Sequence, residues 1–157
     1  MTFIRTPCQN YNLIQPPHAQ AKATVTILEF RQLRELELRL DQPSSLENLP
    51  ISSITSTELR KIIFRVSYMT NYTAFARSMK DWPPVDELLC QLVDQLHATR
   101  PNHTLEVELR LTGIYGDTEG YNFNVFLPKF REKGVVTIVD VAHGDRVLHF
   151  STHNYSG

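Results

Sequence analysis

The chain has 157 residues, of which 41% are hydrophobic and 21% are charged, and its formal net charge is −1. This composition supports a folded core and excludes disorder as the main state. Because 16 Lys and Arg residues are interleaved with 17 Asp and Glu residues, the basic surface typical of a nucleic-acid-binding protein is not expected either. The length fits one domain, which we place at residues 24–157 after an N-terminal segment, 1–23, whose structure the sequence does not determine.

Neither a metal, a cofactor nor a membrane is expected. Cys8 and Cys90 lie in unrelated contexts and are too few for a disulfide framework or a thiolate metal site. The N-terminus carries Pro and polar residues where a signal peptide needs an apolar run, and no apolar stretch approaches the ~20 residues of a membrane helix. We therefore expect a cytoplasmic or nuclear protein.

The first predicted strand lies in FRQLRELELRL, residues 30–40, where Leu36, Leu38 and Leu40 alternate with charged residues. The pattern returns 26 residues later in TELRKIIFRV, with Ile62 and Phe64 in the places of Leu36 and Leu38. A period of about 20–29 residues with L-x-x-L-x-L at the strand is typical of leucine-rich repeats, in which each repeat adds one parallel strand.

A third strand is predicted in TLEVELRL, residues 104–111, after an insertion that contains the clearest helical stripe in the chain. That stripe runs through DWPPVDELLCQLVDQLHATRP, residues 81–101, and it predicts Leu89 and Leu92 to be core residues. If Leu105 lies beside Ile62, the outward residues form rows across the sheet, and Arg65 can pair with Glu108.

The last part of the chain predicts one more helix and two more strands. Phe123, Phe126, Leu127 and Phe130 share a helical face, with Gly134 at the expected C-cap position. The strand GVVTIVDV follows, and the turn signal HGD, residues 143–145, indicates an antiparallel hairpin. The predicted fold is α/β: a short leucine-rich-repeat-like array with a mainly parallel sheet backed by helices and closed by a C-terminal β-hairpin.

Three motifs together resemble the C-terminal leucine-rich-repeat-like region of fungal F-box proteins: the pair LRELEL and LRKIIF, the lead-in ITSTELRKI, and the ending LPKFREKGVVTIVDV with RVLHFS. The resemblance covers roughly residues 24 to 151. It implies a curved α/β repeat that recruits a target protein and is joined to an F-box that docks on a ubiquitin ligase adaptor. No F-box-like helical block precedes the repeats, so only target recognition is expected of this chain, and the family brings no catalytic residue.

An enzymatic site is the main alternative. His143, Asp145 and His149 could act as general acid–base partners of a small hydrolase or nuclease. No nucleophile motif or H-E-x-x-H motif accompanies them, and His143 and Asp145 are also ordinary turn residues. We therefore favour a structural role for these residues.

The leading hypothesis is a non-enzymatic module that binds another protein of unknown identity. Its expected surface has two parts, the outward rows of the sheet and aromatic residues on long connections. A self-associating structural protein, and hence a homo-oligomer, is a further alternative because a repeat array without polar caps leaves apolar ends to cover. The candidate residues are Glu37, Ile63 and Glu106 in one row, Arg39, Arg65 and Glu108 in the next, and the aromatic residues Tyr72, Trp82 and Tyr115.

Overall fold

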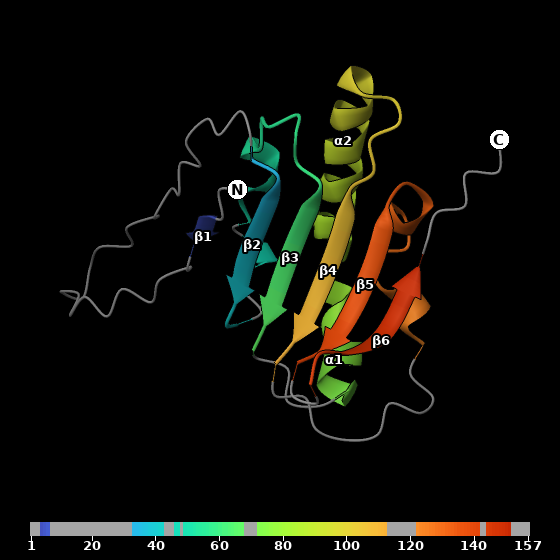
Figure 1. Ribbon diagram of the computed structural model, residues 1–157. Coiled ribbons are helices and arrows are strands. Elements are labelled where there is room, and N and C mark those ends of the chain that lie inside the picture. The colour runs from blue at the N-terminus through green and yellow to red at the C-terminus, as the bar shows by residue number, and fades with distance from the viewer. Residues whose placement is uncertain are drawn as a thin grey trace, which may run out of the picture.

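A single mainly parallel sheet organises the fold. The computed structural model describes residues 4–6, 33–42, 46–47, 49–67, 72–112, 122–141 and 144–151. The strands lie in chain order: β1 (Ile4–Thr6), β2 (Glu35–Leu40), β3 (Lys61–Val66), β4 (Glu106–Leu111), β5 (Val135–Asp140) and β6 (Arg146–Ser151). Strands β1 to β5 pair in parallel, and β6 pairs with β5 in the antiparallel direction (Figure 1). The predicted α/β class with a mainly parallel sheet is thus confirmed.

The helices lie behind the sheet as it is seen in Figure 1. The α-helices are α1 (Tyr72–Ser78) and α2 (Pro83–Thr99), and the 3₁₀ turns are η2 (Pro50–Ser53), η3 (Met79–Asp81), η4 (Phe123–Val125) and η5 (Phe130–Glu132). Two prolines occupy the first turn of α2, where their missing N–H groups need no helical acceptor. The predicted inserted helix is therefore confirmed. None of the helices in the described ranges is long and apolar enough to span a membrane.

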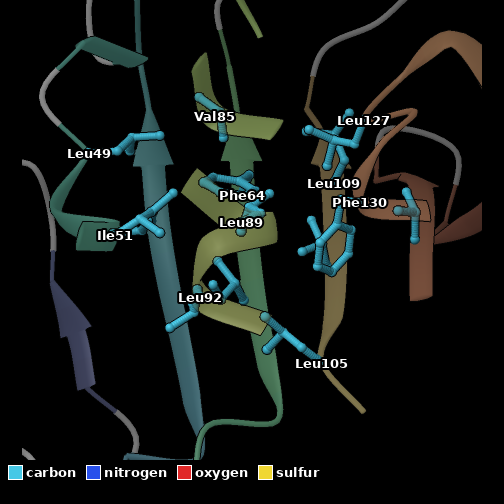
Figure 2. Packing of buried hydrophobic residues seen from close by; sticks show 14 of the residues in the cluster. Leu49, Ile51, Phe64, Val85, Leu89, Leu92, Leu105, Leu109, Leu127 and Phe130 are labelled. Atoms are coloured by element: carbon cyan, nitrogen blue, oxygen red, sulfur yellow. The ribbon is translucent and has the colours of Figure 1, made fainter. Parts of the chain in front are cut away.

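One core holds the sheet and α2 together. The apolar face of α2 presents Val85, Leu89 and Leu92 to the side chains of the sheet, as Figure 2 shows. Trp82, just before α2, packs edge-on against Phe64 and Phe126, with ring centroids 5.5 Å and 4.8 Å away. The sequence prediction that Leu89 and Leu92 are core residues is correct.

The connection before β5 differs from the prediction, because two 3₁₀ turns replace the expected helix. Pro128 removes a backbone donor between them, and the N–H groups of Lys129 and Phe130 instead donate to the buried carboxylate of Asp86 at 3.1 Å and 2.8 Å. The four predicted apolar residues are nevertheless all buried. Gly134 is needed for space, since a Cβ there would lie 2.4 Å from Cζ of Phe130 and 2.8 Å from the carbonyl oxygen of Leu105.

The register of β4 also differs from the prediction. Leu36 lies beside Ile62 as expected, but Ile62 lies beside Val107 and not beside Leu105. Both residues face the core, and because strand side chains alternate with a period of two, a shift of two positions leaves the hydrophobic pattern unchanged. The backbone bond from Glu106 N–H to the Arg60 carbonyl, 2.8 Å long, belongs to the observed register.

We predict that Leu92→Ala lowers the free energy of unfolding by about 2–5 kcal/mol, because it removes a buried side chain from the contact between α2 and the sheet. Denaturant melts measure the loss. Gln91→Ala on the exposed side of α2 is the control and should stay within about 0.5 kcal/mol of the wild type. Equal stabilities for the two variants would contradict the packing of this helix face.

Candidate functional site on the uncovered face of the sheet

The two faces of the sheet differ sharply in chemistry. The side chains that face the helices, such as Leu36, Ile62 and Val107, belong to the core. On β2, β3 and β4 the alternate residues are charged in eight of nine positions, the exception being Ile63. Within the described ranges no helix lies over this second face (Figure 1), which we call the uncovered face.

The register arranges the uncovered face in three rows that cross the strands. The first row is Glu35, Lys61, Glu106 and Val135; the second is Glu37, Ile63, Glu108, Thr137 and Phe150; the third is Arg39, Arg65, Arg110, Val139 and Val147. The predicted rows therefore contain the right residues of β2 and β3, but Glu106 and Glu108 each belong one row earlier. Arg110 takes the place predicted for Glu108.

Ion pairs connect residues within the first row and between neighbouring rows. Lys61 Nζ lies 3.1 Å from Oε1 of Glu106 and also contacts Glu108. The carboxylate of Glu108 accepts a further hydrogen bond from Nε of Arg110. Because Glu108 is buried and carries two cationic partners, this cluster is the most constrained charged group of the face.

The protonation of this cluster follows from its contacts. Burial by itself would raise the pKa of Glu108, but hydrogen bonds from Lys61 and Arg110 outweigh it and hold that pKa below 4.5, its ordinary value. Burial would likewise lower the pKa of Lys61, whereas its bonds to Glu108 and Glu106 raise it above 10.5. Glu108 and Lys61 are therefore both charged at neutral pH.

Arg39, Arg65 and Arg110 lie level with one another on adjacent strands and form what we call the arginine row. The predicted pair between Arg65 and Glu108 is wrong, because Glu108 lies level with Ile63, and Nε of Arg65 donates instead to Glu37 at 3.1 Å. Arg39 is exposed and makes no ion pair with the described residues.

An apolar patch continues the face beyond the arginine row. Val147 and Phe150 on β6 are 58% and 59% exposed. Leu148 is an extra residue in the pairing with β5, since Val139 lies opposite Val147 and Ile138 opposite His149. This bulge brings Val147 and Phe150 to the same side of the sheet although they are three positions apart.

The predicted aromatic surface is not supported at Trp82. Its side chain is only 2% exposed and lies in the core between Phe64 and Phe126, so it cannot contact a partner. The ring is buried because it fills the space between the start of α2 and the sheet. The side chain of Tyr72 and all of Tyr115 lie outside the described residues.

The two candidate catalytic residues that the structure describes, Asp145 and His149, do not share one site. Asp145 is exposed, has φ of 57° and acts electrostatically on Arg110, on the uncovered face. His149 lies level with Ile138 on the opposite face, where its Nε2 accepts from the guanidinium of Arg131. His143 is outside the described residues, and no group of three metal-ligating side chains occurs among those described.

Lys61, Arg110, Val147 and Phe150 are members of the face that sequence reasoning missed. The alternation of β3 and β4 already places Lys61 and Arg110 on the outward side, and only the register error hid Arg110. Val147 and Phe150 carried no such signal, because a regular strand would point them to opposite faces. Comparison with protein-family models, with curated proteins and with solved structures finds no match for the chain.

We predict that Glu108→Gln lowers the free energy of unfolding at pH 7 by about 1–3 kcal/mol, because it leaves Lys61 and Arg110 without their shared carboxylate. Because the folded-state pKa of Glu108 lies below 4.5, the contribution is present above that pH and is lost as pH falls through the folded-state value. Denaturant melts at pH 7 and pH 3 measure both effects. Glu47→Gln, at an exposed position, is the control, and equal losses would contradict the cluster.

A second prediction concerns His149. Burial and the charge of Arg131 lower the pKa of this side chain from 6.5. The unfolded chain then binds a proton more readily than the folded chain, so stability should decline as pH falls below about 6.5 towards the folded-state pKa. His149→Gln should reduce this decline, as followed by thermal melts between pH 7.5 and pH 5. An unchanged pH dependence in the variant would show that another group is responsible.

Proposed function

We propose that this chain is a non-enzymatic recognition module of the leucine-rich-repeat type that binds another protein through its uncovered face. The main observation in favour of this proposal is a parallel sheet whose second face has ordered rows of charged residues and no described helix over it. Parallel sheets usually have both faces covered, and their strands then read as continuous hydrophobic runs. Strands β2, β3 and β4 alternate instead, as strands facing water on one side do.

The spacing of the parallel strands supports a repeat architecture. The level residues Leu36, Ile62, Val107 and Val136 are separated by 26, 45 and 29 positions. The longest of these intervals contains α1 and α2, so a helical insertion accounts for it. Repeat proteins of this kind bind their partners along an extended surface formed by successive repeats. Target recognition is also the role implied by the resemblance to F-box proteins.

The charge pattern supports a protein as the partner. The four acidic and four basic residues on β2, β3 and β4 balance one another, and most of them are already paired. A phosphate backbone favours a uniformly basic stripe, whereas mixed charges next to apolar groups suit a protein surface. The hydrolase alternative gains no support, because Asp145 interacts electrostatically with Arg110 of the uncovered face, whereas His149 contacts Arg131 on the opposite face.

A photo-crosslinking experiment tests this proposal. Phe150 is replaced by p-benzoylphenylalanine, which keeps an aromatic ring on the uncovered face, and in a second protein Gln91 on the exposed side of α2 is replaced in the same way. Both proteins are irradiated in a lysate of the source organism. We expect discrete protein adducts from position 150 that position 91 does not give.

Identical adducts from both positions, or none from position 150, would overturn recognition through this face. Adducts formed only with a second copy of the chain would replace the proposal by the self-association alternative. Mass spectrometry of the adducts distinguishes these results.

A further inference from the structure

We infer that the partner presents an acidic segment followed by apolar residues, and that this segment lies across the strands along the third row of the uncovered face. The inference rests on the proposed function and names the chemistry of its partner. The row begins with Arg39, Arg65 and Arg110 on β2, β3 and β4 and ends with Val139 on β5, which is buried, and Val147 on β6, which is exposed. A cationic half and an apolar half thus form one continuous line.

The arginines have donors left for a partner. The described bonds of Arg65 and Arg110 to Glu37 and Glu108 use Nε, and the terminal nitrogens of these two guanidinium groups donate no hydrogen bond to the described residues. A guanidinium binds a carboxylate with two parallel N–H···O bonds when two of its nitrogens are available. Exposed Arg39 makes no ion pair with the described residues, so its guanidinium is available for such a bond.

The acidic neighbours position the arginines as well as neutralising them. Glu37 and Glu108 hold Arg65 and Arg110 in place before any partner arrives, so less side-chain freedom is lost on binding. Arg39 is the member of the row without such a neighbour among the described residues, and it therefore contributes the least compensated positive charge. It should be the residue on which binding depends most.

The dimensions fit a helix or an extended peptide laid across the strands. Neighbouring strands lie about 4.8 Å apart, so the three arginines are spaced by about that distance and the whole row spans about 19 Å. Acidic residues at positions i and i+4 of a helix have Cβ atoms about 5–6 Å apart, close to the spacing of the arginines. A helix of about 13 residues covers the full row.

The apolar end gives the segment a direction. Val147 is 58% exposed at the end of the row, and Phe150, 59% exposed, lies in the row beside it. Apolar side chains of the partner that follow its acidic residues would remove both from water. A nucleic acid fits less well, because the apolar end of the row offers its phosphates no donor.

The probe for this inference is a fluorescein-labelled helical peptide of about 18 residues, with Glu at three positions spaced by four and two Leu residues one turn later. Fluorescence anisotropy at low salt measures its binding to the full chain. We expect Arg39→Glu to weaken binding at least about tenfold, and a rise in salt to weaken it as well. Arg34→Glu makes the same charge change at an exposed position just before β2 and should change binding less than about twofold.

Two further arms test the two halves of the row. A peptide with Gln in place of each Glu should lose most of its affinity, and Val147→Asp should weaken binding of the original peptide. Thermal melts establish that the variants are folded, which is expected because Arg39 and Val147 are exposed.

Three results would overturn the inference. The first is equal binding of the peptide by Arg39→Glu and Arg34→Glu, and the second is equal affinity of the wild type for the Gln and Glu peptides. The third is displacement of the labelled Glu peptide by single-stranded DNA at a lower concentration than the unlabelled Glu peptide requires. Protein adducts at position 150 without any binding of the Glu peptide would overturn the acidic partner and leave recognition through this face standing. The absence of both would overturn the proposed function as well.

Discussion

Every described connection between the strands from β2 to β5 returns over the same face of the sheet. The return after β2 contributes Leu49 and Ile51, α2 follows β3, and the 3₁₀ turns that contain Phe123 and Phe130 precede β5, and all of these pack into one core. Parallel neighbours require such crossovers, since a short turn cannot join them. Because all of them use one face, the other has to be compatible with water.

The charged rows are the consequence of this one-sided arrangement. A hydrophobic second face would expose a large apolar patch, which soluble proteins seldom do outside binding sites. Here long charged side chains take those positions, and Glu37 and Glu108 pair with cations from neighbouring strands. Ile63 is buried among them although it lies outside the core, as expected where the aliphatic stems of Lys and Arg shield apolar surface.

Both apolar packing and polar contacts stabilise the covered face. Asp86, buried on α2, accepts bonds from two backbone N–H groups of the connection before β5 and so fixes that connection against the helix. The side chain of Trp82, by contrast, is held by packing alone, since its buried Nε1 has no hydrogen-bond partner among the described residues. Its edge contacts with Phe64 and Phe126 and the burial of a large ring offset the cost of that unpaired donor.

The sequence by itself determined the class of the fold and the composition of both faces of β2, β3 and β4. Alternation with a period of two assigns Leu36 to the core and Arg39 to water whatever the neighbouring strands do, and the helical stripe of α2 follows from side-chain spacing in the same local way. Such patterns depend only on the geometry of one element, which is why they can be predicted without knowing the rest of the molecule.

Only the tertiary structure decided which outward residues meet. Shifting β4 by two positions keeps every side chain on its face, so the hydrophobic pattern cannot distinguish the two registers. The backbone bonds between β3 and β4 select one of them, and that choice gives Glu108 to Lys61 and aligns Arg110 with Arg39. The bulge at Leu148, which brings Val147 and Phe150 to the same face, likewise depends on pairing with β5, a long-range contact that local spacing does not encode.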